Sequence, residues 1–255
     1  MSSDSSLAGW LRAEPFTLTL GSGFFGFFAH FGVLKALLER ELKPARLTGA
    51  SSGALIAGSY AAGMSVSEIE QLLFSLRRED FWDPGLGLGL LKGELFRRRM
   101  RETFPCQRLE ETKLPLTLSV YNLNDKTTEV LEYGDLVDAV YASCALPLLF
   151  QPLKRQGVRL ADGGIKDRPA LAGVAENERV LIHHIASKSP WRRASDPALV
   201  PPQRSNGTTI SLLGLTRVSP FRLEQGPEAF RQAYRLTSQL LDRNWSNLLQ
   251  ESVPK

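Results

Sequence analysis

Strands and helices alternate along the first sixty or so residues of this chain, and that order constrains the fold more than any other feature. Hydrophobic spacing indicates a strand at Phe16–Leu20, a helix at Ala29–Arg40, a second strand at Arg46–Thr48 and a second helix at Ser52–Ala62. Strand–helix–strand units place their helices against a parallel sheet. We therefore predict an α/β fold with a largely parallel sheet at its core.

Further elements follow the same logic. Ser65 and Glu68 stand three residues apart at the start of the next helix, the spacing of a capping box. Leu114–Tyr121 and Thr127–Tyr133 flank a polar turn and predict a β-hairpin. We also predict a glycine-rich loop, a helix, two strands and a long C-terminal amphipathic helix, at Asp83–Gly93, Asp135–Ser143, Val158–Leu160, Arg179–Ile185 and Pro227–Leu249, respectively.

No repeat or composition shift divides the 255 residues, so we predict a single domain. Its core would cover about residues 16–190, and a basic loop and the C-terminal helix would cover about 191–250. The two cysteines are too few for a disulfide framework or a four-cysteine zinc site, and suit a reducing cytoplasm. We find no secretory signal peptide and no run of the roughly 18 apolar residues that span a membrane. We expect a cytoplasmic protein that is at most peripheral to a membrane.

The net charge of +4 is a mild basic excess, which suits anionic surfaces but carries little weight alone. We predict no nucleic-acid partner, and the oligomeric state is left open. No cluster of histidine, cysteine and carboxylate residues has metal-ligand spacing, so we predict no metal.

The sharpest motif is Gly49-Ala50-Ser51-Ser52-Gly53, which matches G-x-S-x-G between the second strand and the second helix. In a nucleophile elbow the central serine occupies a strained strand-to-helix turn, and small flanking residues let neighbouring backbone approach it. The hydroxyl then lies at a helix N-terminus, whose dipole favours developing negative charge. We predict Ser51 as a nucleophile. The competing interpretation is a structural Ser/Gly-rich helix start.

A second glycine motif, Gly21-Ser22-Gly23-Phe24-Phe25-Gly26, follows the first strand. Such glycines leave backbone N–H groups free to converge on a phosphate or an oxyanion. The G-x-G-x-x-G spacing also fits a dinucleotide-binding turn. That alternative needs an acidic residue at the end of the second strand, where this chain has Thr48 and Gly49.

A third motif, Asp162-Gly163-Gly164, ends a short strand and offers a carboxylate as a base for Ser51. A simple Asp-Gly turn is the competing interpretation. The order Ser51, Asp162, then His183 or His184 also matches a hydrolase triad. Both histidines, however, lie inside an apolar strand rather than on a loop beyond it, which favours a structural role for them.

Together these residues resemble the patatin-like phospholipases, which combine a glycine-rich oxyanion loop, G-x-S-x-G and a D-G-G/A motif. The resemblance extends to AHFGVLKALLE after the glycine loop and to YASCALPLLFQPL before the aspartate. It spans about residues 18 to 175. Three motifs in the right order are far more specific than any one of them.

The resemblance implies a three-layer α/β/α sandwich around a central mixed, mostly parallel sheet. It also implies a lipid acyl hydrolase with a Ser–Asp dyad, no catalytic histidine and no cofactor. Ser51 would be the nucleophile and Asp162 the base. The acyl oxyanion would be received by backbone N–H groups of Gly21, Gly23, Phe24 and Ser52, and the remaining motif glycines are Gly26, Gly49, Gly53, Gly163 and Gly164.

The glycine loop departs from the family, because Phe24-Phe25 stands where members usually carry arginine or lysine. Four phenylalanines around Gly26 favour an apolar acyl pocket, with core packing as the alternative for Phe27 and Phe28. Three hypotheses therefore remain: a dyad lipid hydrolase, a soluble esterase with a triad, and a non-catalytic lipid-binding protein. Transient membrane contact through Trp191-Arg192-Arg193 and the Trp245 helix is a further hypothesis.

Overall fold

The computed structural model describes residues 5–186 and 199–245. Its main sheet has the strand order β10-β9-β1-β2-β4-β8-β7, with β5 also paired to β4. The five strands from β10 to β4 are parallel, whereas β5, β7 and β8 run antiparallel to their neighbours. The prediction of a mixed, mostly parallel central sheet is therefore confirmed. The strands are β1 (Thr17–Leu20), β2 (Arg46–Ala50), β4 (Leu116–Asn122), β5 (Thr127–Leu131), β7 (Leu153–Arg155), β8 (Val158–Asp162), β9 (Val180–His184) and β10 (Gly207–Ser211).

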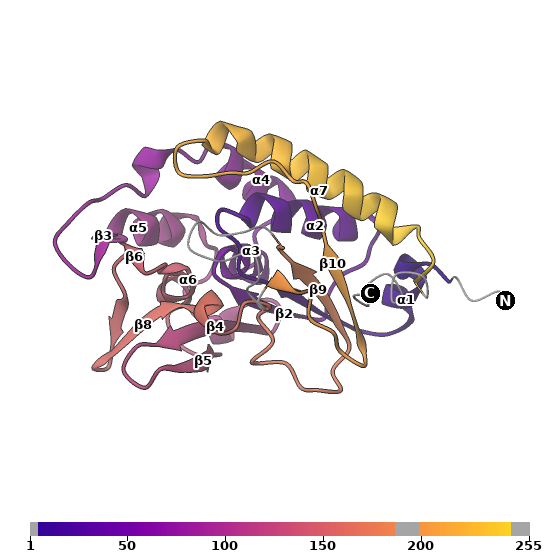
Figure 1. The fold of residues 1–255 in the computed structure, drawn as a ribbon, viewed down its shortest axis with the longest axis horizontal. Coiled ribbons are helices and arrows are strands. Elements are labelled where there is room, and N and C mark those ends of the chain that lie inside the picture. Colours follow the sequence, from indigo (N-terminus) through magenta and orange to yellow (C-terminus); the bar gives the residue numbers. More distant parts are fainter. Residues whose placement is uncertain (1–4, 187–198, 246–255) are drawn as a thin grey trace.

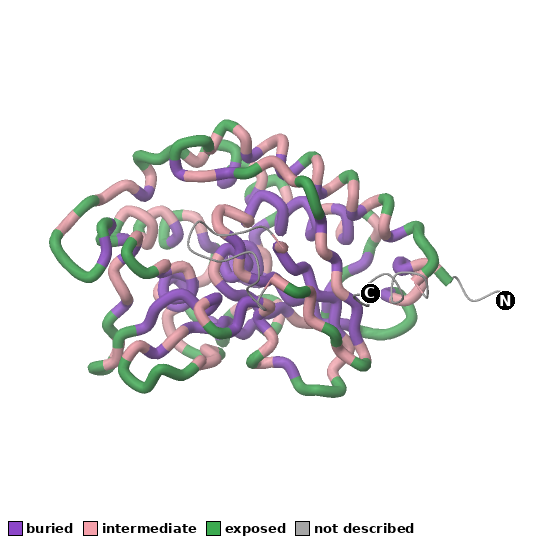
Figure 2. Tube along the Cα trace, viewed as in Figure 1, coloured by how far each residue is buried: buried purple, intermediate pink, exposed green. Residues whose placement is uncertain are grey.

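Helices lie mainly over one face of this sheet, and α7 forms an outer tier over α2 (Figure 1). Leucines of β1, β2, β4 and β9 point into the core beneath these helices. Figure 2 shows the buried residues concentrated in α3 and the central strands. The helices are α1 (Leu7–Ala13), α2 (Phe27–Glu39), α3 (Ser52–Ala61), α4 (Val66–Phe74), α5 (Glu94–Thr103), α6 (Leu136–Cys144) and α7 (Gly226–Leu241).

The opposite face of the sheet is covered by the irregular segment between β8 and β9. There Val174 packs on Val180 and Ile182. Thr48 donates a hydrogen bond to the Ala170 carbonyl at 2.7 Å, and Arg46 donates to the Gly173 carbonyl at 2.7 Å. In this molecule the third layer of the expected sandwich is thus supplied largely by loop backbone.

Most predicted elements are present, with bounds shifted by a few residues. The capping box of Ser65 and Glu68 is confirmed, as is the β4–β5 hairpin. The predicted loop at Asp83–Gly93 contains a short strand, β3 (Gly89–Leu91), which pairs in parallel with β6 (Leu148–Phe150). The predicted C-terminal helix ends at Leu241 instead of continuing to 249, and residues beyond 245 lie outside the described part.

Candidate active site

Ser51 occupies the turn between β2 and α3 with φ 54° and ψ −122°, a conformation that L residues rarely adopt. Its amide N–H donates to the Ser143 hydroxyl oxygen at 2.9 Å. Gly53 allows α3 to begin very close to the end of β1, because a Cβ on this residue would lie 1.9 Å from the carbonyl oxygen of Leu20. A Cβ on Gly49 would likewise clash with the backbone of Ala54, so both motif positions require glycine for steric reasons.

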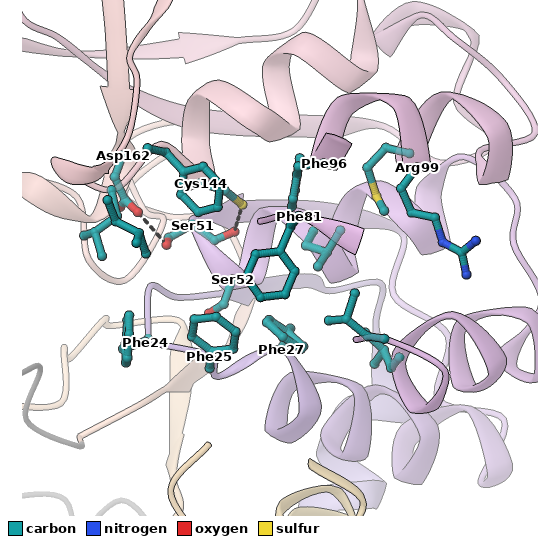
Figure 3. A pocket seen from close by; sticks show the side chains of 18 of the residues that line it. Phe24, Phe25, Phe27, Ser51, Ser52, Phe81, Phe96, Arg99, Cys144 and Asp162 are labelled. Carbon is teal, nitrogen blue, oxygen red and sulfur yellow. Dashed lines mark hydrogen bonds between the residues drawn. The ribbon is translucent and has the colours of Figure 1, made fainter. Parts of the chain in front are cut away.

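Asp162 ends β8 and is only 3% exposed. The Ser51 hydroxyl donates to its Oδ2 at 2.6 Å (Figure 3), and the Gly164 amide donates to its Oδ1 at 2.8 Å. Gly163 allows the strand to bend into this position, because a Cβ there would lie 2.0 Å from the Ser119 carbonyl oxygen. The fold thus brings together two predicted residues that are far apart in the sequence.

The glycine loop lies beside the pair of Ser51 and Asp162. The Gly21 amide donates to the His183 carbonyl at 3.2 Å, so it continues the strand pairing of β1 with β9. The Ser22 amide donates to the Arg168 carbonyl, and the Ser22 side chain lies over Gly164. The loop is therefore fixed at its base by the segments on either side of it.

The tip of that loop turns tightly around Gly23 to Gly26. The Gly26 amide donates to the Gly23 carbonyl at 2.9 Å, and Phe25 has φ 53°. Ile185 packs so close to Gly23 and Gly26 that a Cβ on either would lie within 2.7 Å of it. Ser52 is the first residue of α3, where a helix leaves its amide N–H without an intrahelical partner.

Two side chains that we did not predict hold the elbow in place. The Ser143 hydroxyl accepts from the Ser51 amide while donating to the Ser119 carbonyl at 2.7 Å. The neighbouring Cys144 thiol donates to the Ser51 carbonyl oxygen at 3.0 Å (Figure 3), and burial raises the pKa of this thiol well above its usual value. Both lie in the YASCALPLLFQPL stretch, but no spacing rule distinguishes them there from ordinary helix residues.

The histidines lie within the core. His30 on α2 and His183 on β9 are joined by a hydrogen bond of 2.8 Å between their Nδ1 atoms. Burial lowers the pKa of His30 to about 3, and it lowers the pKa of His183 well below its usual value. His184 Nε2 lies 3.2 Å from the Leu199 carbonyl oxygen, and burial lowers its pKa to about 4. All three are therefore neutral at physiological pH.

A narrow apolar cavity of about 110 Å³ opens beside Ser51 and Asp162. Phe24, Phe25 and Phe27 form part of its wall. Phe27 and Phe28 are both buried in the core, as the core-packing alternative predicted. Arg99 lies on the side of the cavity away from the two polar residues in Figure 3. The other lining side chains are mostly large and apolar: Leu55, Leu72, Leu73, Leu76, Phe81, Phe96, Met100, Leu146, Leu149 and Phe150.

Three further predictions concern metal binding, membrane-spanning helices and the tryptophans proposed for membrane contact. Within residues 5–186 and 199–245, no group of three or more histidine, cysteine or acidic side chains is arranged to hold a metal ion. No helix in that part of the chain is both long and apolar enough to cross a bilayer. Trp245 stacks on Trp10 with ring centroids 5.3 Å apart, which gives it an intramolecular role, while Trp191, Arg192 and Arg193 lie outside the described residues.

Comparison with known families identifies the chain. A family profile described as patatin-like phospholipase matches residues 18–173, which contain all three motifs. The chain belongs to the patatin-like phospholipase family. The match covers β1 through the segment after β8, and thus both the elbow and the buried aspartate.

Among the relatives of this chain is an uncharacterized NTE family protein of Mycobacterium tuberculosis, strain ATCC 25618 / H37Rv. It is 32% identical over 162 residues, which is 62% of this chain and 45% of the relative. The lysophospholipase nte1 of Emericella nidulans is 30% identical over 173 residues, covering 65% of this chain and 11% of the relative. The chain thus spans less than half the length of these relatives.

The fold is also similar to that of a solved bacterial protein. The crystal structure of VipD from Legionella pneumophila superposes with a TM-score of 0.62 at 18% sequence identity. The superposition covers 91% of this chain and 67% of VipD. At that identity the likeness concerns the fold alone, which extends beyond the residues matched by the family profile.

Proposed function

We propose that this patatin-like phospholipase hydrolyses carboxylic esters of lipids through an acyl-serine intermediate, with Ser51 as the nucleophile and Asp162 as its base. The observation that carries the proposal is the 2.6 Å hydrogen bond from the Ser51 hydroxyl to Asp162 Oδ2. A serine hydroxyl is weakly nucleophilic until a base lies within hydrogen-bond reach of it. Asp162 meets that requirement directly, and its Oδ1 is oriented by the Gly164 amide.

In the first step the Ser51 oxygen attacks the ester carbonyl carbon while its proton passes to Asp162. The carbonyl oxygen becomes an oxyanion, for which we propose the amides of Gly23, Phe24 and Ser52 as donors. Gly21 has a different role in this proposal, because its amide is bonded to His183 and anchors the loop. Collapse of the intermediate expels the alcohol, which takes the proton from Asp162.

In the second step water attacks the acyl-serine. Asp162 accepts the proton of the water, the same amides hold the second oxyanion, and the fatty acid leaves as Ser51 recovers its proton. A carboxylate is an intrinsically weak base, so this route relies on the fixed geometry of the amides and on exclusion of water from the site. Both features are consistent with the buried position of Asp162 and the apolar cavity beside it.

The shape of the cavity supports a substrate with one acyl chain in the site. It is narrow and lined mostly by aromatic and aliphatic side chains, with the two polar reacting groups at one part of its wall. The Emericella nidulans relative is named a lysophospholipase, and a lysophospholipid carries a single acyl chain. We propose lysophospholipids and related single-chain esters as the preferred substrate class.

The test is hydrolysis of a series of p-nitrophenyl esters and a lysophospholipid by four proteins. Ser51→Ala and Asp162→Asn are expected to lose activity by about a thousandfold or more, while Ser59→Ala serves as the control. Ser59 lies on α3, and its hydroxyl donates only to the Leu55 carbonyl among described residues. Full activity of a folded Ser51→Ala variant would contradict the proposal.

A fourth variant separates the dyad from the triad. His183→Gln replaces the histidine with a neutral polar side chain, and its folding is checked by thermal unfolding. The dyad predicts that the folded variant keeps most of its activity, because the Nδ1 atom of His183 is bonded to His30. A folded but inactive variant would instead favour the triad.

A further inference from the structure

Residues 83–92 form a hairpin-like tip at one end of the molecule, at the left of Figure 1. The Gly85 amide donates to the Leu90 carbonyl at 2.9 Å, and the Lys92 amide donates to the Asp83 carbonyl at 3.0 Å. Between these bonds leucines alternate with glycines, as Gly85-Leu86-Gly87-Leu88-Gly89-Leu90. The residues between the leucines are glycines, so no neighbouring side chain within the segment covers the leucines.

Those leucines point into solvent. Leu86 is 103% exposed, Leu88 60% and Leu90 48%, and Leu148, which pairs with Gly89 across β3 and β6, is 84% exposed. We call these four residues the leucine tip. Leu91, by contrast, is fully buried beneath it. An exposed cluster of large aliphatic side chains on a globular protein marks an interaction site.

The surrounding bonds hold the leucine tip outward. Asp83 accepts hydrogen bonds from the first amides of α5, those of Gly93, Glu94 and Leu95. The Gln151 side chain donates to the Leu86 carbonyl at 3.0 Å. Leu148 itself has φ 69°, a left-handed conformation that is unfavourable for a leucine. The fold therefore maintains an exposed leucine at a local conformational cost.

The leucine tip adjoins the cavity beside Ser51. Leu146, Leu149 and Phe150 line that cavity and stand on either side of Leu148 in the sequence. Leu149 and Phe150 of β6 line the cavity, whereas Leu148 of the same strand is exposed to solvent. The same three-residue strand thus connects the substrate site with the exposed apolar surface.

Basic side chains flank the leucine tip. Helix α5 begins immediately after it and carries four arginines, Arg97, Arg98, Arg99 and Arg101. Arg97 and Arg101 form ion pairs with aspartates of the α6 region. Arg98 is exposed, with no ion pair to any described residue. Lys92 is exposed at the base of the tip and forms a long, solvent-exposed ion pair with Glu94 at 3.9 Å. Aliphatic side chains next to basic ones match the acyl boundary and the anionic headgroups of a bilayer.

We propose that the leucine tip docks onto the surface of an anionic phospholipid bilayer and brings the cavity of Ser51 to the lipid. This docking proposal rests on the proposed function, because docking would serve lipid hydrolysis. Vesicle binding itself is measured independently of catalysis. Leu86, Leu88 and Leu148 enter the acyl boundary, while Arg98 and Lys92 contact the headgroups. This surface is distinct from the Trp245 region, where Trp10 covers the indole.

The test is flotation of the protein with vesicles of phosphatidylcholine alone or mixed with phosphatidylglycerol. Wild type is expected to float with the mixed vesicles, and Leu86→Glu/Leu88→Glu is expected to reduce the bound fraction about tenfold or more. Leu213→Glu is the matched control, because Leu213 is 75% exposed and lies outside the tip, after β10. Arg98→Glu is expected to weaken binding to the mixed vesicles only.

Hydrolysis of a short, soluble p-nitrophenyl ester is measured in parallel. The tip variants are expected to keep wild-type rates there, which also shows that they are folded. Wild type that cleaves the soluble ester but does not float overturns the docking proposal, as does a tip variant that floats like wild type. A dimer that the tip variants abolish, without vesicle binding, assigns the surface to self-association instead. Wild type that floats through the tip but cleaves no ester leaves docking in place and rejects the proposed function.

Discussion

The Ser143 hydroxyl lies between two backbone segments, accepting from the Ser51 amide at 2.9 Å and donating to the Ser119 carbonyl at 2.7 Å. It thereby joins the elbow to β4 and α6 while Ser51 holds a positive φ. The catalytic serine proposed here is thus positioned by a second serine 92 residues away in the sequence.

Ser143→Ala removes that link. The Ser51 amide would lose its buried partner, at a cost of about 1–3 kcal/mol, and the elbow would relax from its strained conformation. We expect kcat on a soluble ester to fall roughly tenfold to a hundredfold with little change in KM. Steady-state kinetics, with thermal unfolding to confirm the fold, provide the measurement. Wild-type kcat in the folded variant would show that Ser143 does not position Ser51.

Gly53→Ala tests the close approach of α3 to β1. The new methyl group would lie 1.9 Å from the Leu20 carbonyl oxygen, so backbone must move. We expect a loss of several kcal/mol in the free energy of unfolding, measured by urea titration, or failure to fold. Gly157→Ala is the comparison, because no atom lies within 4 Å of its added Cβ and only its φ of +83° opposes alanine. That variant should lose about 1–2 kcal/mol.

The buried histidines predict a stability that falls on mild acidification. In the unfolded chain a histidine has a pKa of about 6.5, whereas burial lowers the pKa of His30 to about 3. Between these values the unfolded state binds more protons, so stability is full above pH 6.5 and declines as the pH falls toward 3. The shift of His30 alone corresponds to about 2 kcal/mol between pH 7 and pH 5. Urea titrations at the two pH values measure it.

His30→Gln is the control for that pH dependence. It removes one titrating group while leaving a polar side chain near His183, so its stability should decline less steeply between pH 7 and pH 5. An unchanged slope would mean that His30 does not contribute to the acid sensitivity.

The sequence was most informative where steric rules act locally. The elbow and the glycine loop each require small residues at fixed spacing, so Gly53 and Gly26 point to their turns without any tertiary knowledge. The helix and strand alternation likewise predicted the parallel sheet, because the buried faces repeat with their own periods.

What could not be predicted depends on contacts between distant segments. Nothing in the spacing around Ser143 shows that its hydroxyl would meet Ser51, and the pairing of His30 with His183 arises only when α2 packs on β9. Helix α5 was not predicted, because its four arginines leave no helical spacing of apolar residues to recognise. Met100 is its only buried residue. The third layer was expected, but its construction from loop backbone between β8 and β9 was not foreseeable, since such a segment carries no periodic signal.

Met100 offers a test of the cavity as an acyl site. Its side chain is 3% exposed and lines the cavity next to Arg99 in the sequence. Met100→Trp would fill part of the cavity without adding charge. We expect kcat/KM for long-chain p-nitrophenyl esters to fall about tenfold or more, while the acetate ester, which does not extend into the cavity, is cleaved at wild-type rates. A uniform loss across all chain lengths would point to misfolding, and an unchanged chain-length profile would place the acyl chain elsewhere.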